Sequence, residues 1–197
     1  MDLTFRDSVP GDLPMAADAC YGMWFRKDYG EGLGRLIADA YAAMHYRNAD
    51  LRVTAVLDGE PEGVCFIRTV PGETDASDFD SFSEVEGFEV AMGDMRILHR
   101  ADEGLRREFG IEADAEVLLL MVGSRSRGRG VGRKLLNEAV SRLSDMGCRS
   151  FMLFTDDDCD YGFYDKIGMR RRGMVIVDFH GYPLKRIAYS QEIPKKN

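Results

Sequence analysis

A short apolar run followed by a helical repeat is the clearest pattern along the chain. Residues 117–121 are all apolar, which predicts a buried strand over 116–122 because the run is too short for a helix. From Val131 to Leu143 the apolar residues recur at the spacing of one helix face, and Gly147 follows at the expected stop. A strand, a loop and an amphipathic helix are therefore predicted in that order.

Weaker patterns predict the elements on either side. Two apolar stripes at helical spacing are separated by a glycine-rich break at 30–34, and runs with strand character flank the Asp58-Gly59 turn and a second turn at 180–183. These patterns predict strands over 3–6, 51–57, 63–70, 150–155, 174–179 and 186–189, and helices over 13–24, 33–44 and 162–166.

The segment 71–114 is acidic in its first half and helical in its second. A run of carboxylates without any Lys or Arg is typical of a solvated surface, or of a rim that attracts a cationic amine through long-range electrostatics. Between 98 and 109 apolar residues return at helical spacing, so we expect helices that cover part of the sheet or a partner subunit. The carboxylates are Glu73, Asp75, Asp78, Asp80, Glu84, Glu86, Glu89 and Asp94.

The loop between the predicted strand and helix has the composition of an anion site. Its glycines let backbone N–H groups approach a ligand closely, and these groups open a helix whose dipole is positive at that end. Four arginines add positive charge in an otherwise acidic chain. The ligand implied is a phosphate or pyrophosphate. The glycines are Gly128, Gly130 and Gly132, and the arginines are Arg125, Arg127, Arg129 and Arg133.

Two known phosphate motifs fit this loop poorly. A Walker-type loop requires Gly-Lys-Ser/Thr, which is missing here. A dinucleotide fingerprint requires G-x-G-x-x-G directly after the strand, whereas Gly132 comes one residue early and five residues separate Val122 from Gly128. The acidic residues 156–158 follow the next strand, where a ribose-binding carboxylate belongs. A nicotinamide- or flavin-dinucleotide-binding enzyme therefore stays open as the weaker alternative.

Two motifs at their usual separation resemble a known family. Residues 127–132, Arg-Gly-Arg-Gly-Val-Gly, match the Arg/Gln-x-x-Gly-x-Gly/Ala signature of the GCN5-related N-acetyltransferases (GNAT), and 162–169 resembles their Phe-Tyr-x-x-x-Gly-Phe segment. The resemblance implies an α/β (α+β) fold of three layers, with a mixed, twisted sheet of about seven strands and helices on both faces. It also implies one acyl-CoA N-acyltransferase domain over 1–197, with 71–114 as an acidic, partly helical insertion.

The resemblance also assigns the cofactor site and one acceptor wall. The backbone at the end of the central strand would face the pantetheine arm of acetyl-CoA, and the glycine loop would hold its pyrophosphate. The aromatic residues Trp24, Phe25 and Tyr29 would border the acceptor pocket. The cofactor-binding residues implied are Met121, Val122, Arg127, Gly128, Arg129, Gly130, Val131, Gly132 and Arg133.

The catalytic residues implied are Tyr164 and Glu116. Tyr164 matches the tyrosine that protonates the departing thiolate in the family, and Glu116 matches a carboxylate that takes the amine proton through water. The carboxylates of 156–158 are alternative bases. The family commonly has Asn near 157 and Ala at 160, where this chain has Asp157 and Asp160, so these either point away from the polyphosphate or serve the acceptor.

Composition excludes several other classes. A net charge of −8 argues against nucleic acid as a partner. The four cysteines lack metal spacing, and the three histidines are scattered, so no metal is predicted and the thiols are expected to be reduced and buried. Neither a membrane span nor a signal peptide is recognisable, which favours the cytoplasm. The family resemblance adds the expectation of a homodimer.

The function predicted from these observations is transfer of an acetyl group from acetyl-CoA to a primary amine. The acidic insertion favours a small cationic acceptor, although the sequence does not distinguish small molecules from peptides or proteins. A non-catalytic acyl-CoA sensor of the same fold stays open beside the dinucleotide alternative.

Overall fold

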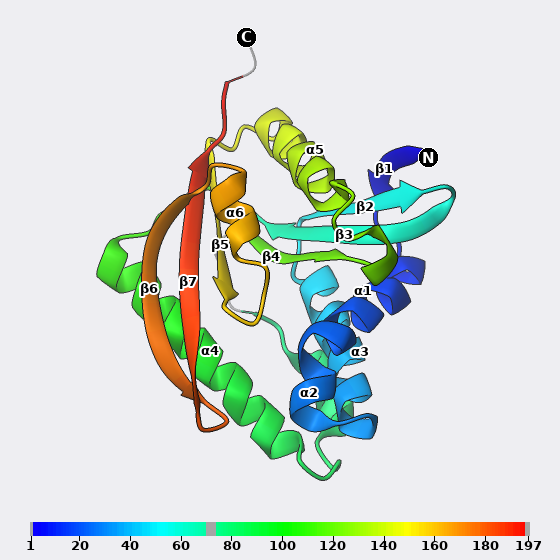
Figure 1. Cartoon of the computed structure of the whole chain (residues 1–197), viewed down its shortest axis with the longest axis vertical. Coiled ribbons are helices and arrows are strands. Elements are labelled where there is room, and N and C mark those ends of the chain that lie inside the picture. Colours follow the sequence, from blue (N-terminus) through cyan, green and yellow to red (C-terminus); the bar gives the residue numbers. More distant parts are fainter. Residues whose placement is uncertain (1, 70–73, 196–197) are drawn as a thin grey trace.

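A mixed sheet with seven strands forms the centre of the molecule (Figure 1), as seen in a computed structural model that describes residues 2–69 and 74–195. The strand order is β1-β2-β3-β4-β5-β7-β6, and all neighbours are antiparallel except β4 and β5. The strands are β1 (Leu3–Asp7), β2 (Leu51–Leu57), β3 (Glu60–Arg68), β4 (Ala115–Val122), β5 (Ser150–Asp156), β6 (Arg170–Phe179) and β7 (Tyr182–Glu192).

Helices cover both faces of this sheet, which gives the three layers that were predicted. The helices are α1 (Leu13–Cys20), α2 (Arg26–Tyr29), α3 (Gly32–Arg47), α4 (Phe88–Phe109), α5 (Val131–Asp145) and α6 (Gly162–Lys166). Short 3₁₀ turns are η1 (Pro10–Asp12), η3 (Ser77–Phe82) and η4 (Ser124–Ser126), and η2 (Tyr21–Phe25) is a π-helix. α5 packs on one face, where Leu135 and Leu143 are buried against Val53 and Phe151. α1 and α3 pack on the other face, against Phe66 of β3.

The central strand β4 carries an irregularity that opens the sheet. Its register with β3 shifts so that Phe66 pairs with Leu119 while Ile67 pairs with Val117, which leaves Leu118 as the extra residue of a bulge. Parallel pairing with β5 ends at the same place, because Val117 with Leu153 is the last pair formed. From there to Val122 the β5-facing edge of β4 runs free of ladder partners, and the two strands diverge.

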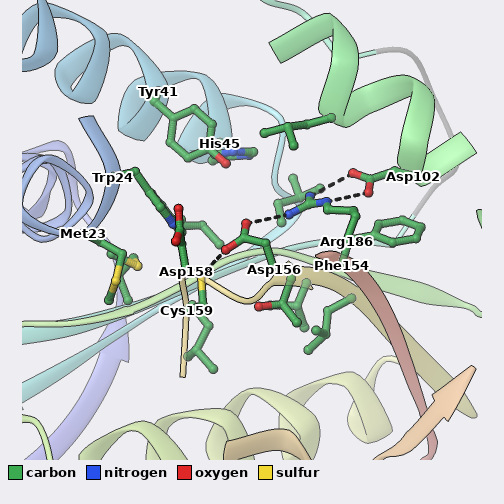
Figure 2. A pocket seen from close by; sticks show the side chains of 18 of the residues that line it. Met23, Trp24, Tyr41, His45, Asp102, Phe154, Asp156, Asp158, Cys159 and Arg186 are labelled. Carbon is green, nitrogen blue, oxygen red and sulfur yellow. Dashed lines mark hydrogen bonds and ion pairs between the residues drawn. The ribbon is translucent and has the colours of Figure 1, made fainter. Parts of the chain in front are cut away.

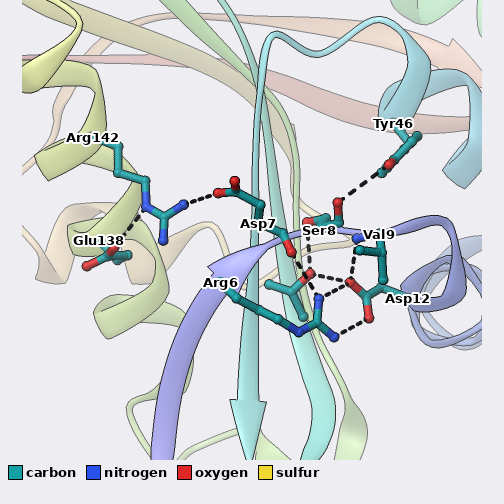
Figure 3. Close-up of polar contacts among 9 residues, drawn as sticks. Arg6, Asp7, Ser8, Val9, Asp12, Tyr46, Glu138 and Arg142 are labelled. Carbon is teal, nitrogen blue, oxygen red and sulfur yellow. Dashed lines mark hydrogen bonds and ion pairs between the residues drawn. The ribbon is translucent and has the colours of Figure 1, made fainter.

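The turn between β1 and α1 is held by one buried carboxylate (Figure 3). Asp12 accepts hydrogen bonds from both terminal nitrogens of Arg6 at 2.7 Å, from the Val9 N–H at 2.9 Å and from the Thr54 hydroxyl at 2.8 Å. Although burial opposes its ionisation, these donors lower the pKa of Asp12. β1 is thereby fixed to β2, and the chain is directed into α1.

Most elements agree with the pattern-based predictions, and the differences have physical reasons. β3 begins at Glu60 rather than 63 because the tight turn at 58–59 lets the ladder close at once. The stripe predicted as one helix over 13–24 continues through a π-helix into α2. The hairpin strands β6 and β7 extend well beyond the predicted runs, since their outer positions are polar and show no apolar pattern.

The predicted insertion forms η3 and α4, and α4 lies across β6 and β7 (Figure 1). Its helical half therefore covers the sheet of its own chain. Residues 71–73 of this segment, including the predicted rim residue Glu73, lie outside the described residues. Most of the remaining acidic side chains are exposed, although Asp94 is buried. Within the described part of the chain, no helix combines the length and apolarity that crossing a bilayer requires.

Candidate active site

A cavity of about 1140 Å³ lies where β4 and β5 diverge. Its walls come from segments far apart in the sequence: η2, α2 and α3, then α4, and also β4, the end of β5 and the start of β7. Figure 2 shows the part of the cavity that lies between α3 and the strands. The volume exceeds that of most small-ligand pockets, so two reactants can be held together.

One end of the cavity is formed by the loop between β4 and α5. Gly128 and Gly130 have φ values of 73° and 77°, a left-handed conformation that glycine adopts without strain. Gly130 is the cap residue of α5, so the N–H groups of the first helical turn have no partners within the helix and their dipoles point into the cavity. This geometry is that of an anion site.

The same loop is anchored from below by β3. The buried carboxylate of Glu62 accepts the Ser126 hydroxyl at 2.9 Å and pairs with Arg125 at 3.2 Å, while its backbone carbonyl accepts the Gly123 N–H at 2.9 Å. Arg127 donates from Nε to the Val122 carbonyl at 3.2 Å. Each of these bonds ties the loop to the sheet, so the protein's own side chains and backbone hold the loop in place.

The structure brings nearly all of the predicted cofactor residues to this cavity. The lining includes Met121, Val122, Arg127, Gly128, Gly130, Val131, Gly132 and Arg133. Arg129 is exposed and is not part of the lining. The two predicted catalytic residues, Tyr164 and Glu116, also line the cavity. Their common location agrees with the predicted roles, which stay predictions.

Tyr164 comes from α6, whose residue range was predicted exactly. The centroid of its ring lies 5.4 Å from that of the Tyr189 ring and 5.2 Å from that of the Phe163 ring. Burial, together with the neighbouring Cys159, raises the pKa of Tyr164 above its usual value. The phenol therefore keeps its proton at neutral pH.

Glu116 lies at the start of β4 between two arginines. Its Oε2 is 2.8 Å from the Nη2 of Arg68 and 2.8 Å from the Nη2 of Arg106. Two guanidinium groups thus contact one carboxylate oxygen, which fixes the position of the Glu116 side chain.

The acidic residues after β5 divide into different environments. Asp157 bonds the backbone N–H of Lys185 at 2.8 Å and its ammonium at 3.1 Å, outside the cavity lining. Asp158 lines the cavity mouth and pairs with Lys27 at 3.2 Å. Asp160 also lines the cavity. Of the two departures from the family pattern, Asp157 thus points away from the cavity and Asp160 borders it.

Asp156 belongs to a buried chain of charges in the cavity wall (Figure 2). Arg186 donates to both oxygens of Asp102 at 2.7 and 2.9 Å, and its third nitrogen donates to Asp156 at 3.1 Å. Asp156 also accepts the Cys159 thiol at 3.1 Å. Burial alone would lower the pKa of Arg186, but the charges of Asp102 and Asp156 raise it. This network of three side chains therefore contains two carboxylates and one guanidinium.

The opposite wall is aromatic. Trp24, Phe25 and Tyr29, which were predicted as acceptor-pocket walls, all line the cavity. The Tyr41 ring lies 5.9 Å from Trp24 and 5.2 Å from Phe25, with edges facing rings in both pairs. Gly34 of α3 allows this packing, since a Cβ there would lie 2.4 Å from the Phe25 carbonyl oxygen.

Comparisons with known proteins match this geometry. The family model described as Acetyltransferase (GNAT) family matches residues 19–169. The chain belongs to the GNAT acetyltransferase family. No curated protein matches the chain.

Solved structures support the same fold. A GNAT-family structure from Desulfovibrio desulfuricans superposes with a TM-score of 0.62 at 16% identity and covers 98% of this chain and 100% of its own. An aminoglycoside 6′-N-acetyltransferase complexed with coenzyme A gives 0.59 at 16% identity, covering 100% and 99%. A Salmonella typhimurium protein with its cofactor acetyl-CoA gives 0.59 at 12% identity, covering 100% and 97%. At these identities the likeness shows the fold alone.

Several cavity residues had no signal in the sequence. Tyr41 appeared only as part of a core stripe, and His45 fitted no required position. Asp102 and Arg186 have charged neighbours in the sequence, Glu103 and Lys185, and nothing in the sequence distinguishes them. Their side chains meet only because α4 crosses β7.

Proposed function

We propose that the chain transfers an acetyl group from acetyl-CoA to a primary amine, acting as a single acyltransferase domain. The observation that carries this proposal is the divergence of β4 and β5 beside the glycine loop. The loop suits a pyrophosphate, and the edge of β4 from Leu118 to Met121, which has no ladder partner on the β5 side, suits an extended amide-containing arm. Pantetheine pyrophosphate combines both features in one molecule.

Positioning accounts for most of the chemistry in this proposal. The amine must be neutral when its lone pair attacks the thioester carbonyl; the new C–N bond forms as the C–S bond breaks, and the thiolate leaves with a proton. When both reactants are held in one cavity, the reaction between them becomes effectively unimolecular and no longer requires an encounter in solution. The N–H groups of β4 at the splay polarise the carbonyl.

Tyr164 is the proposed proton donor to the thiolate. A free phenol has a pKa of about 10 and a thiol about 8.5, so this transfer is uphill, and burial makes it more so. Tyr164 therefore acts through a short hydrogen bond that forms as charge develops on sulfur.

Glu116 is the proposed acceptor of the amine proton, through water. Its pairing with Arg68 and Arg106 fixes the carboxylate so that it can orient a water molecule, and Asp156 is the alternative on the β5 side. The acceptor is proposed to be cationic in solution, because the carboxylates of Asp28, Asp94 and Asp158 line the cavity and attract such a molecule.

Calorimetric titration with acetyl-CoA, with NADH under the same conditions, tests the cofactor assignment. Acetyl-CoA binding with no NADH signal supports the proposal, and a panel of amines followed by thiol release then tests turnover. NADH binding alone would overturn it. Acetyl-CoA binding without turnover of any amine would favour a sensor of the same fold.

A further inference from the structure

His45 is a polar side chain that the proposed mechanism leaves unused. It lies on α3 and lines the cavity. Both of its ring nitrogens are buried and have no hydrogen-bond partner within the described chain. A buried donor or acceptor without a partner costs about 1–3 kcal/mol, so such a group in a cavity wall indicates a ligand that supplies the missing bonds.

The protonation state of His45 defines what this ligand must offer. Burial, with further help from the charges of Arg68 and Arg186, lowers the pKa of His45 to about 3. The neutral imidazole has one donor nitrogen and one acceptor nitrogen. A hydroxyl or an amide can satisfy it, whereas an ammonium group can only donate.

Aromatic and apolar side chains lie beside His45, in addition to the charges of Arg68 and Arg186 that act on it. Its ring meets the Tyr41 ring edge-on at 4.3 Å, and Figure 2 shows these two residues together, with Trp24 and Met23 farther along the same wall. Met44 of α3 and Phe154 of β5 also line this part of the cavity. The body of a bound molecule would therefore lie against apolar surface.

The charges facing this wall suit one ammonium group. The buried network of Asp102, Arg186 and Asp156 has two carboxylates and one guanidinium, and burial raises the pKa of Asp102. On the same lining Arg68 and Arg106 share the carboxylate of Glu116, Asp158 is paired with Lys27, and buried Asp94 contacts Tyr29 and His180. These pairings leave no match for more than one added cation inside the cavity.

From this juxtaposition we infer the acceptor class: a primary amine on an apolar or aromatic body that carries one neutral donor–acceptor group, a hydroxyl or amide, bound by His45. The inference rests on the proposed acetyl transfer. Asp156 receives the amine end, Trp24 and Tyr41 pack on the body, and His45 bonds the neutral group. The competing occupant is a polyamine, which would have to place a further ammonium beside Asp28 at the mouth.

Matched pairs of amines test this inference. Each pair shares one skeleton and differs by a hydroxyl, such as tyramine with phenethylamine and 4-aminobutanol with butylamine, and spermidine represents the polyamines. We expect the hydroxyl member to have a kcat/KM about 10-fold or more above its partner, because the partner leaves His45 unsatisfied. Spermidine is expected to be the poorer substrate.

The variant His45→Leu links this preference to the residue. It should reduce the hydroxyl preference to about 1, by lowering kcat/KM for the hydroxyl member more than for its partner. Asp39→Ala, on the exposed face of the same helix, is the control and should keep the wild-type ratio. Circular dichroism of both variants checks that each is folded, and His45→Asn, which keeps a donor and an acceptor, should restore part of the preference.

The outcomes separate this inference from the proposed function. If no amine releases thiol from acetyl-CoA, the acetyl transfer itself is refuted. If amines are acetylated but the pairs react equally, or if His45→Leu keeps the wild-type ratio, the role of His45 is refuted. Acetylation confined to spermidine would assign the cavity to polyamines instead.

Discussion

The two ends of the cavity are built in different ways. The proposed cofactor end is a contiguous segment, from Met121 to Arg133, in which glycines and the start of α5 line the cavity. The proposed acceptor end is assembled from side chains on η2, α3, α4, β5 and β7. The cofactor end offers one chemistry, the binding of an anion by backbone N–H groups. At the acceptor end, replacing a single side chain changes which molecule can bind. A family can therefore keep one cofactor while its acceptors diverge.

The largest effect is expected from Gly130→Val at the cofactor end. Gly130 has a φ of 77°, which a β-branched residue adopts only with strain, and the new side chain would stand beside the N–H groups of α5. We expect the affinity for acetyl-CoA, measured by calorimetry, to fall by about 100-fold or more.

Gly147→Val is the matched control for that variant. Gly147 has a φ of 87° beyond the opposite end of α5 and does not line the cavity. The backbone strain is comparable, so stability should fall in both variants while only Gly130→Val loses the ligand. Retained affinity in Gly130→Val would show that the loop does not hold the cofactor.

This contrast also explains what could be predicted from sequence. The strand-loop-helix unit and α6 follow from local periodicity and glycine spacing, and they were predicted nearly to the residue. The bulge at Leu118 could not be predicted from the sequence, because Leu118 is one of five consecutive apolar residues. The pairing of Arg186 with Asp102 depends on how α4 crosses β7, and no local pattern encodes a contact 84 positions apart.

Tyr164→Phe should produce the next largest effect, on turnover alone. The ring packing against Tyr189 and Phe163 is kept, while the proton donor is lost. We expect kcat to fall by about 100-fold with unchanged acetyl-CoA affinity, as measured by thiol release and calorimetry.

Tyr161→Phe provides the control, since Tyr161 precedes α6 and is absent from the cavity lining. Its activity should equal that of the wild type. A Tyr164→Phe enzyme with undiminished kcat would assign protonation of the thiolate to another group or to water.

Glu116→Gln is expected to have a smaller effect, of about 10-fold on kcat. The amide keeps the shape of the carboxylate but removes the charge that Arg68 and Arg106 share, so water is less well oriented toward the amine. The fall in kcat, measured by thiol release, decides its role: a reduced kcat supports Glu116, and an undiminished kcat favours Asp156. Glu112→Gln, at an exposed position before β4, should behave as the wild type.

The last prediction concerns stability at the proposed acceptor end, where the buried imidazole of His45 has no hydrogen-bond partner among the described residues. The folded-state pKa of His45 is about 3, below the unfolded value of about 6.5, so between these values the unfolded chain binds the proton and the folded chain does not. His45 thus imposes no protonation penalty above pH 6.5, and it destabilises the fold progressively as pH falls toward 3, by up to about 1.4 kcal/mol per pH unit. Urea unfolding from pH 7 to 4 should show a shallower loss of stability for His45→Leu than for the wild type or for the exposed-site variant His99→Leu.

At pH 7 His45→Leu should be more stable than the wild type, because leucine removes two unpartnered nitrogens. Greater stability combined with lost hydroxyl preference would mark His45 as a residue kept for its ligand, and equal slopes for all three proteins would show that its nitrogens reach water.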